Sequence, residues 1–250
     1  MKILLSNLRL ALAGAALFSS FVPLSAVGAP FTLALSTSFD CASAAPPSGL
    51  GSLNCNPALP QHLEWVQGNV AVSKLDLSDT IQNGVNPGDA PVVIGTLTHT
   101  NVVIPVAFNY AINILSSLAV TDEADLSVDN FPEQAIGITF TESANQEPCP
   151  PPNPEGSICD DFFTFDLGGL APVQFTDSEG KLRTLTFGLL AGPGTTIIGN
   201  QVFTAEATTS SISITAKIDA VNIDTPTTLL LFGLGLVLIS FGIRRQQHRS

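Results

Sequence analysis

The side chains best suited to catalysis or ligand binding lie together in the stretch "THTN", residues 98–101. His99 is one of three histidines in the chain, and an imidazole can bind a metal ion or transfer protons when partner side chains hold it in place. The sequence has no Gly-x-Ser-x-Gly elbow, no His-Glu-x-x-His pair and no glycine-rich phosphate loop. Thr, His and Asn side chains also bond backbone groups where one strand ends and another begins. We therefore expect Thr98, His99 and Asn101 to have a structural role, with a ligand or catalytic role for His99 as the alternative.

A second group of candidate ligands is the acidic stretch "DEADLSVDN", residues 122–130. Carboxylate oxygens suit Ca²⁺, so Asp122, Asp125 and Asp129 are weak candidates for a calcium loop. The stretch lacks the spacing and the central glycine of an EF-hand, and a solvated acidic turn is the simpler interpretation. We therefore expect no metal and no cofactor. A pair of catalytic carboxylates is possible in so acidic a chain, but nothing in the order of residues favours it, and we expect no enzyme activity.

Four cysteines, Cys41, Cys55, Cys149 and Cys159, form an even set. In an exported protein such a set favours disulfides, and sequence alone allows three pairings. The local pairs Cys41–Cys55 and Cys149–Cys159 close short loops and are preferred. The alternative, metal binding, usually needs CxxC-type spacing, which is absent here.

Strand patterns dominate the middle of the chain. "SISITAKIDA" and "AFNYAINI" alternate apolar with polar residues, as half-buried antiparallel strands do. "FTLALSTS", "AIGITFTE", "FFTFDL" and "RTLTFGLL" are further short runs of β-forming residues. Turn residues separate the runs, for example Asn83-Gly84 and Gly192-Pro193-Gly194. The pattern predicts an all-β protein with a single β-sandwich of jelly-roll type.

Three local expectations follow from this pattern. The stretch 92–101 should form a strand, with the next strand starting in "VVIPVAF", residues 102–108. Residues 42–60, rich in Pro, Gly and Ser, should form a loop. Trp65 and Tyr110 are expected in the core, although they are also the aromatic residues best suited to a sugar-binding surface.

The two ends of the chain predict export. Residues 1–28 combine a basic start, an apolar run and small residues near Gly28, as in a secretory signal peptide. Residues 225–243 carry no charge and would span about 28 Å as a helix, close to the hydrocarbon thickness of a bilayer. Arg244 and Arg245 follow, and this places the sandwich, residues 29–222, on the non-cytoplasmic side.

The charge of the predicted exported body excludes some partners. Between residues 29 and 224, 21 acidic residues are opposed only by Lys74, Lys181, Arg183 and Lys217. Such a surface repels phosphate backbones, so nucleic acid is not an expected partner.

The C-terminal segment, residues 223–250, resembles the sorting tag of PEP-CTERM proteins. In that family a short motif, a hydrophobic helix and a basic pair direct processing by a membrane enzyme, the exosortase. Here Asp224, Thr225 and Pro226 occupy the motif position, where the family usually has Val-Pro-Glu-Pro; the proline is kept and the glutamate is not.

The stretch "GTLTHTNVVIP", residues 95–105, resembles the signature of the THxN group of these PEP-CTERM proteins. A cysteine pair follows later in the chain, and Ile104-Pro105 stands where related proteins have Pro-Ile. The resemblance implies an exported protein that an exosortase-like enzyme processes. It also implies retention at the membrane through the C-terminal helix, or display at the outer surface or in extracellular matrix.

We therefore expect an exported, non-catalytic cell-surface or extracellular-matrix protein that contacts extracellular polysaccharide. The alternatives are a carbohydrate- or Ca²⁺-binding surface module and, less favoured, a glycoside hydrolase that uses a carboxylate pair.

Overall fold

The computed structural model describes residues 28–45, 51–67, 70–149 and 151–219. The expected signal peptide, except for Gly28, and the expected sorting segment 223–250 lie outside these ranges. Within the described ranges, no helix is long and apolar enough to cross a membrane.

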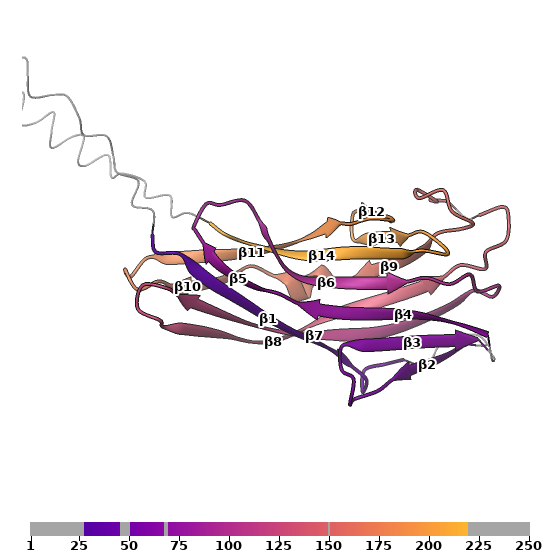
Figure 1. The fold of residues 1–250 in the computed structure, drawn as a ribbon, viewed down its shortest axis with the longest axis horizontal. Coiled ribbons are helices and arrows are strands. Elements are labelled where there is room, and N and C mark those ends of the chain that lie inside the picture. The colour runs from indigo at the N-terminus through magenta and orange to yellow at the C-terminus, as the bar shows by residue number, and fades with distance from the viewer. Residues whose placement is uncertain (1–27, 46–50, 68–69, 150, 220–250) are drawn as a thin grey trace, which may run out of the picture.

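The described chain folds into two antiparallel sheets of seven strands each, which run along the long axis of the molecule (Figure 1). The first sheet has the order β12 (Thr195–Ile198), β13 (Gln201–Thr204), β9 (Asp161–Phe165), β8 (Val128–Glu142), β7 (Phe108–Asp122), β1 (Phe31–Asp40), β5 (Ile81–Val85). The second sheet has the order β10 (Val173–Thr176), β11 (Leu182–Ala191), β14 (Thr209–Ile218), β6 (Val92–Thr100), β4 (Val70–Asp79), β3 (His62–Gln67), β2 (Gly51–Cys55). A single 3-10 turn, η1 (Leu167–Leu170), follows β9. The prediction of an all-β sandwich is confirmed.

The alternation of the sequence explains which faces meet between the sheets. In β14 the residues Ile212, Ile214, Ala216 and Ile218 are buried, as the pattern predicts. The same holds for Phe163 and Phe165 in β9 and for the apolar series of β7. β7 and β8 are 15 residues long, well beyond the short runs predicted, and they form the centre of the first sheet.

The path of the chain is not that of a jelly roll. In a jelly roll two Greek keys carry the strands back and forth between the sheets. Here β7, β8 and β9 remain in one sheet as a meander, and β2, β3 and β4 remain in the other. Within each of these two meanders, strands that follow each other in sequence pair directly, so the chain does not cross between the sheets there.

Two predicted loops contain strand residues. Asn83-Gly84 lies inside β5, where Gly84 has φ +70° and the register against β1 shifts between Phe31 and Leu33. The pair is therefore a bulge and not the predicted turn, because glycine reaches positive φ without a steric cost. The predicted loop 42–60 contains β2, which pairs with β3 at the edge of the second sheet.

The connection after β6 also differs from the prediction. Residues 101–107 are not a strand; they cross from the second sheet to the first, where β7 begins at Phe108. Within this crossing Ile104 is buried, at 1 % exposed, whereas Val103 is 41 % exposed, so its apolar residues are only partly in the core.

The interior between the sheets contains two apolar clusters. One surrounds Trp65, Phe140 and Phe163, and the other surrounds Phe31, Phe175 and Leu185. Trp65 and Tyr110 are 0 % and 2 % exposed, so their expected place in the core is confirmed. Neither ring offers a surface to a sugar.

Both expected disulfides are present, Cys41–Cys55 and Cys149–Cys159. Cys41 directly follows β1 of the first sheet, and Cys55 ends β2, the edge strand of the second. The first disulfide therefore ties the two sheets together. Cys149 and Cys159 close the long loop between β8 and β9, which projects from one end of the sandwich (Figure 1).

At the opposite end of the second sheet, Arg183 of β11 is buried against Asp177. Its Nε donates to the Asp177 carboxylate at 2.8 Å, and Arg183 is 3 % exposed. Asp177 also accepts from the backbone N–H groups of Glu179 and Lys181 and so shapes the turn between β10 and β11.

Replacing this carboxylate should destabilise the fold strongly. Asp177→Ala leaves the guanidinium buried without its partner, and the free energy of unfolding should fall by about 3–5 kcal/mol. Glu179→Ala, which removes an exposed ion pair with Lys181, should cost only about 0–1 kcal/mol. Chemical denaturation of both variants measures the difference, and equal losses would contradict the importance of the buried pair.

Candidate functional site

The "THTN" residues lie at the same end of the sandwich as the Cys149–Cys159 loop. His99 is the last inward-facing residue of β6 and is fully buried, whereas Thr98 faces outward and is half-buried. Thr98 pairs with Ser211 of β14 and Asp76 of β4, so it belongs to the ladder of the second sheet. Asn101 follows β6 and is 3 % exposed.

His99 connects the two sheets. Its ring packs against Trp65, Phe140 and Phe163, with centroid distances of 5.2–5.5 Å. Its Nδ1 lies 2.9 Å from Oγ1 of Thr204 in the opposite sheet. Burial lowers the pKa of His99 to about 3, so the ring is neutral and packs as part of the core.

Asn101 and Ile104 hold two neighbouring loops. The Asn101 N–H donates to the Thr208 carbonyl at 2.9 Å, and its Nδ2 donates to the Ala205 carbonyl at 3.3 Å. The Ile104 carbonyl accepts from Nδ2 of Asn145 at 3.1 Å. The segment after His99 therefore ties the loop after β13 to the loop after β8.

These loops bring three buried carboxyl groups together. Glu142 ends β8, Asp161 begins β9, and Glu206 lies just after β13. Their exposures are 0 %, 0 % and 7 %, and one oxygen from each lies within 4.8 Å of the others. We call Glu142, Asp161 and Glu206 the carboxylate cluster.

Hydrogen bonds hold only part of this cluster. The indole Nε1 of Trp65 donates to Oε2 of Glu142 at 3.0 Å, and the Ser143 N–H donates to Oδ1 of Asp161 at 2.7 Å. Among the described residues, no donor reaches Oε1 of Glu142, Oδ2 of Asp161 or either carboxylate oxygen of Glu206. The two anchored groups are thus fixed in orientation, while four oxygens of the cluster have no donor.

The electrostatics of the cluster follow from this arrangement. Burial, together with the nearby charge of Glu206, raises the pKa of Glu142 to about 8. Burial, followed by the charges of Glu142 and Glu206, raises the pKa of Asp161, and burial also raises the pKa of Glu206. In the described part of the chain no lysine or arginine pairs with these three groups. The cluster therefore favours either bound protons or a bound cation.

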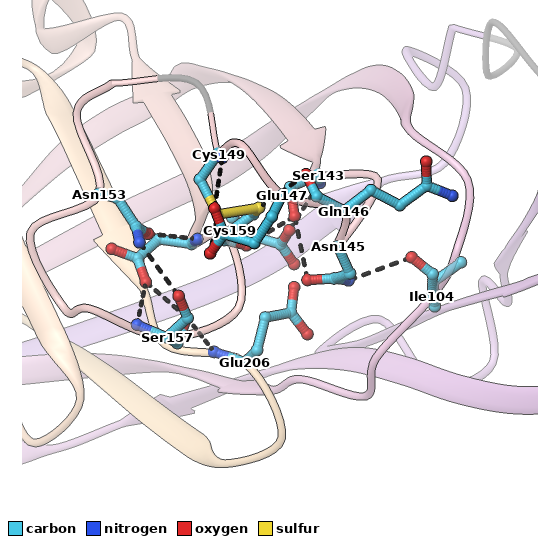
Figure 2. The surroundings of a disulfide bond; sticks show 12 residues. Ile104, Ser143, Asn145, Gln146, Glu147, Cys149, Asn153, Ser157, Cys159 and Glu206 are labelled. Atoms are coloured by element: carbon cyan, nitrogen blue, oxygen red, sulfur yellow. Dashed lines mark hydrogen bonds between the residues drawn. A yellow bond between two sulfur atoms is a disulfide. The ribbon is translucent and has the colours of Figure 1, made fainter.

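The disulfide loop supports the cluster from outside (Figure 2). The Ser157 hydroxyl accepts from the Glu206 N–H at 3.0 Å, and the Ser143 hydroxyl donates to the Cys159 carbonyl at 2.6 Å. Figure 2 shows the Glu206 carboxylate directed toward Asn145, whose nearby side chain opposes the rise that burial causes in the pKa of Glu206. The loop between β8 and β9 thus holds members of the cluster from two elements.

The acidic residues predicted as weak calcium candidates do not join this cluster. Asp122 is buried and accepts from the N–H groups of Ala124 and Ser178 at 2.9 Å each. Asp125 accepts from the Ser127 N–H, and Asp129 is exposed. Asp122 and Asp125 therefore act in turns, and the grouped carboxylates of the described chain lie elsewhere.

The carboxylate cluster was not predicted from the sequence, although a signal for it was present. Glu142 has the same parity as Ile138 and Phe140, and Asp161 the same as Phe163 and Phe165. In a strand, equal parity means the same face, so both carboxyl groups face the core.

Neither a scan against protein-family models nor a search of curated proteins finds a match to this chain.

The cluster predicts an unusual dependence of stability on pH in metal-free buffer. Glu142 titrates near 8 when folded and near 4.5 when unfolded. Below pH about 4.5 both states are protonated, so its stabilising contribution is fully present there. As the pH rises toward about 8, only the unfolded chain releases the proton, and the free energy of unfolding should fall.

The comparison with Glu142→Gln isolates this effect. The raised pKa of His62, caused by hydrogen bonds to Asp76 and Glu64, also removes stability as the pH rises through its range. Because both proteins share that contribution, the difference between them reports the cluster. Denaturation between pH 4.5 and 8 should show a steeper loss in the wild type, and parallel curves would contradict the assignment.

Proposed function

We propose that the chain is an exported, non-catalytic surface or matrix protein whose sandwich is displayed outside the cytoplasm. The two disulfides carry this proposal, because such bonds persist in oxidising compartments. The acidic composition supports it as well, since it keeps a displayed domain soluble. Sorting through residues 223–250, by an exosortase-like enzyme, is part of the proposal.

The depth of the carboxylate cluster supports a non-catalytic role. A glycoside hydrolase needs two carboxyl groups on either side of a sugar linkage. Glu142 and Asp161 are 0 % exposed and lie beneath the Cys149–Cys159 loop. A polymer cannot reach them without opening the sandwich, so this cluster is unsuited to hydrolysis of a polysaccharide.

Intact mass of the native protein, measured separately in membrane and medium fractions, tests the sorting proposal. We expect a form that begins after Gly28 and ends near Thr225. Pro226→Ala should accumulate the uncut form, while Thr227→Ala should behave as the wild type. A mass that includes Arg244 and Arg245 in every fraction would instead identify a permanent anchor.

A specific observation favours carbohydrate binding as a second candidate function. A groove of about 440 Å³ lies on the outer face of the first sheet, over β7, β8 and β9. Asn113, Thr139 and Thr164 line it from neighbouring strands, and Asp166 and Asn200 line it from loops. Gly137 opposite Asn113 presents no side chain, which keeps the groove open. Hydroxyl, amide and carboxylate groups of this kind suit the hydroxyls of a sugar.

Binding to a panel of purified polysaccharides tests this second function. Asn113→Ala should weaken binding at least tenfold, because one sugar contact with a good hydrogen bond is worth about 1.4 kcal/mol. Asn109→Ala is the matched control, since Asn109 lies exposed on the same strand outside the groove. Equal affinities of the two variants would remove the groove from consideration.

A further inference from the structure

We propose that the carboxylate cluster of Glu142, Asp161 and Glu206 binds one Ca²⁺ ion inside the end of the sandwich. This inference goes beyond the proposed function and does not depend on how the chain is anchored. It rests on the free oxygens of the cluster, on two further unpartnered polar groups beside it and on the elements that it joins.

The free oxygens form a suitable ligand set. Trp65 donates to one oxygen of Glu142, and the Ser143 N–H donates to one oxygen of Asp161. The other oxygen of each carboxylate is left available. Both oxygens of Glu206 are available as well. Hydrogen bonds to the outer oxygen of a ligand are the usual means of orienting a metal site. Two oxygens on opposite sides of Ca²⁺ are about 4.8 Å apart, so a single ion can contact all three carboxylates at the observed spacing.

Two buried polar groups beside the cluster give independent support. The Asn101 Oδ1 atom has no hydrogen-bond donor among the described residues, and the Asn101 side chain lies close enough to Glu206 to oppose the rise that burial causes in its pKa. The Tyr110 hydroxyl also has no described partner. Its ring centroid lies 5.4 Å from that of Trp65, and burial, followed by the charges of Glu142 and Asp161, raises its pKa. Asn101 and Tyr110 are 3 % and 2 % exposed, and buried polar groups rarely lack a partner.

The composition of the site favours Ca²⁺ over other ions. All free groups are oxygens, which suit Ca²⁺ and Mg²⁺ and not the softer transition metals. Mg²⁺ requires near-octahedral geometry at about 2.0–2.1 Å and usually keeps several waters, whereas Ca²⁺ accepts 6–8 oxygens in a flexible arrangement. Glu142 and Asp161 are fully buried, so a site there offers little space for retained water.

Such an ion would connect three strands and the disulfide loop. Glu142, Asp161 and Glu206 belong to the ends of β8, β9 and β13. These strands are neighbours in the first sheet, and the loop closed by Cys149–Cys159 joins two of them. Neutralising the cluster would remove the repulsion between its members and stabilise this end of the domain.

Terbium luminescence and thermal melting of the purified full chain, kept in mild detergent at pH 7.5, test the proposal. Tb³⁺ occupies Ca²⁺ sites and is excited through a nearby aromatic ring. Trp65 is the single tryptophan and is bonded to Glu142. We expect sensitised emission that Ca²⁺ displaces and equimolar Mg²⁺ does not. We also expect a saturable rise in melting temperature with Ca²⁺, with a Kd of about 10⁻⁴–10⁻³ M, as in other extracellular calcium modules.

Matched variants separate this site from the acidic surface. Glu206→Gln should weaken Ca²⁺ at least tenfold and melt higher than the wild type in chelator, because it removes one buried charge. Asp129→Asn removes an exposed charge and should retain the wild-type affinity. Equal Ca²⁺ responses in the two variants would show surface binding only and overturn the proposal.

Absence of both the terbium signal and the Ca²⁺-dependent shift in the wild type would also overturn the proposal. The cluster would then share protons instead of holding an ion. If Glu206→Gln fails to fold, Ca²⁺ displacement of Tb³⁺ is compared between the wild type and Trp65→Phe. Trp65→Phe should lose most of the terbium emission, while Ca²⁺ should still raise its melting temperature.

Discussion

The end of the sandwich that contains His99 is organised around a shortage of hydrogen-bond donors. Three carboxyl groups lie inside it, and the described protein supplies donors for only two of their six oxygens. Ionised carboxylates cannot remain buried at such short separations without a compensating charge or bound protons. Whatever neutralises them must therefore be part of the folded state, next to the fully buried Trp65, which donates to Glu142 and packs against Phe140.

The "THTN" stretch has a clear part in this arrangement. His99 reaches Thr204, and Asn101 reaches Ala205, so both residues position the segment that carries Glu206. The stretch positions the segment that carries Glu206, and the acidic residues supply the negative charge of the cluster. A histidine whose pKa is lowered by burial suits a frame better than a proton carrier, because it stays neutral over the physiological range.

Much of the fold could be predicted from local patterns, and most of the site could not. The alternation in β14 and β9 and the short cysteine spacings report local geometry, which sequence reveals directly. Glu142 and Asp161 come from separate strands and Glu206 from the loop after a third, and only the pairing of β8, β9 and β13 brings them together. The "DEADLSVDN" stretch shows the reverse relation: its acidic residues are close in sequence, but Asp122 and Asp125 accept hydrogen bonds in turns and do not meet at one site. Parity within β8 and β9 was the one available clue, because it placed carboxyl groups on the apolar face.

The position of the Cys149–Cys159 loop has a consequence for biogenesis. Cys159 is two residues before Asp161, and Ser143, which holds Asp161, also bonds the Cys159 carbonyl. The disulfide therefore shortens the free loop between Glu142 and Asp161 and restrains how far the two can separate in the unfolded chain. A nascent chain kept reduced would present the acidic residues on an unclosed loop, exposed to chaperones and proteases. Thiol oxidation would thus favour closure of this end of the domain, because the reduced chain has to bring Glu142 and Asp161 together across a longer open loop.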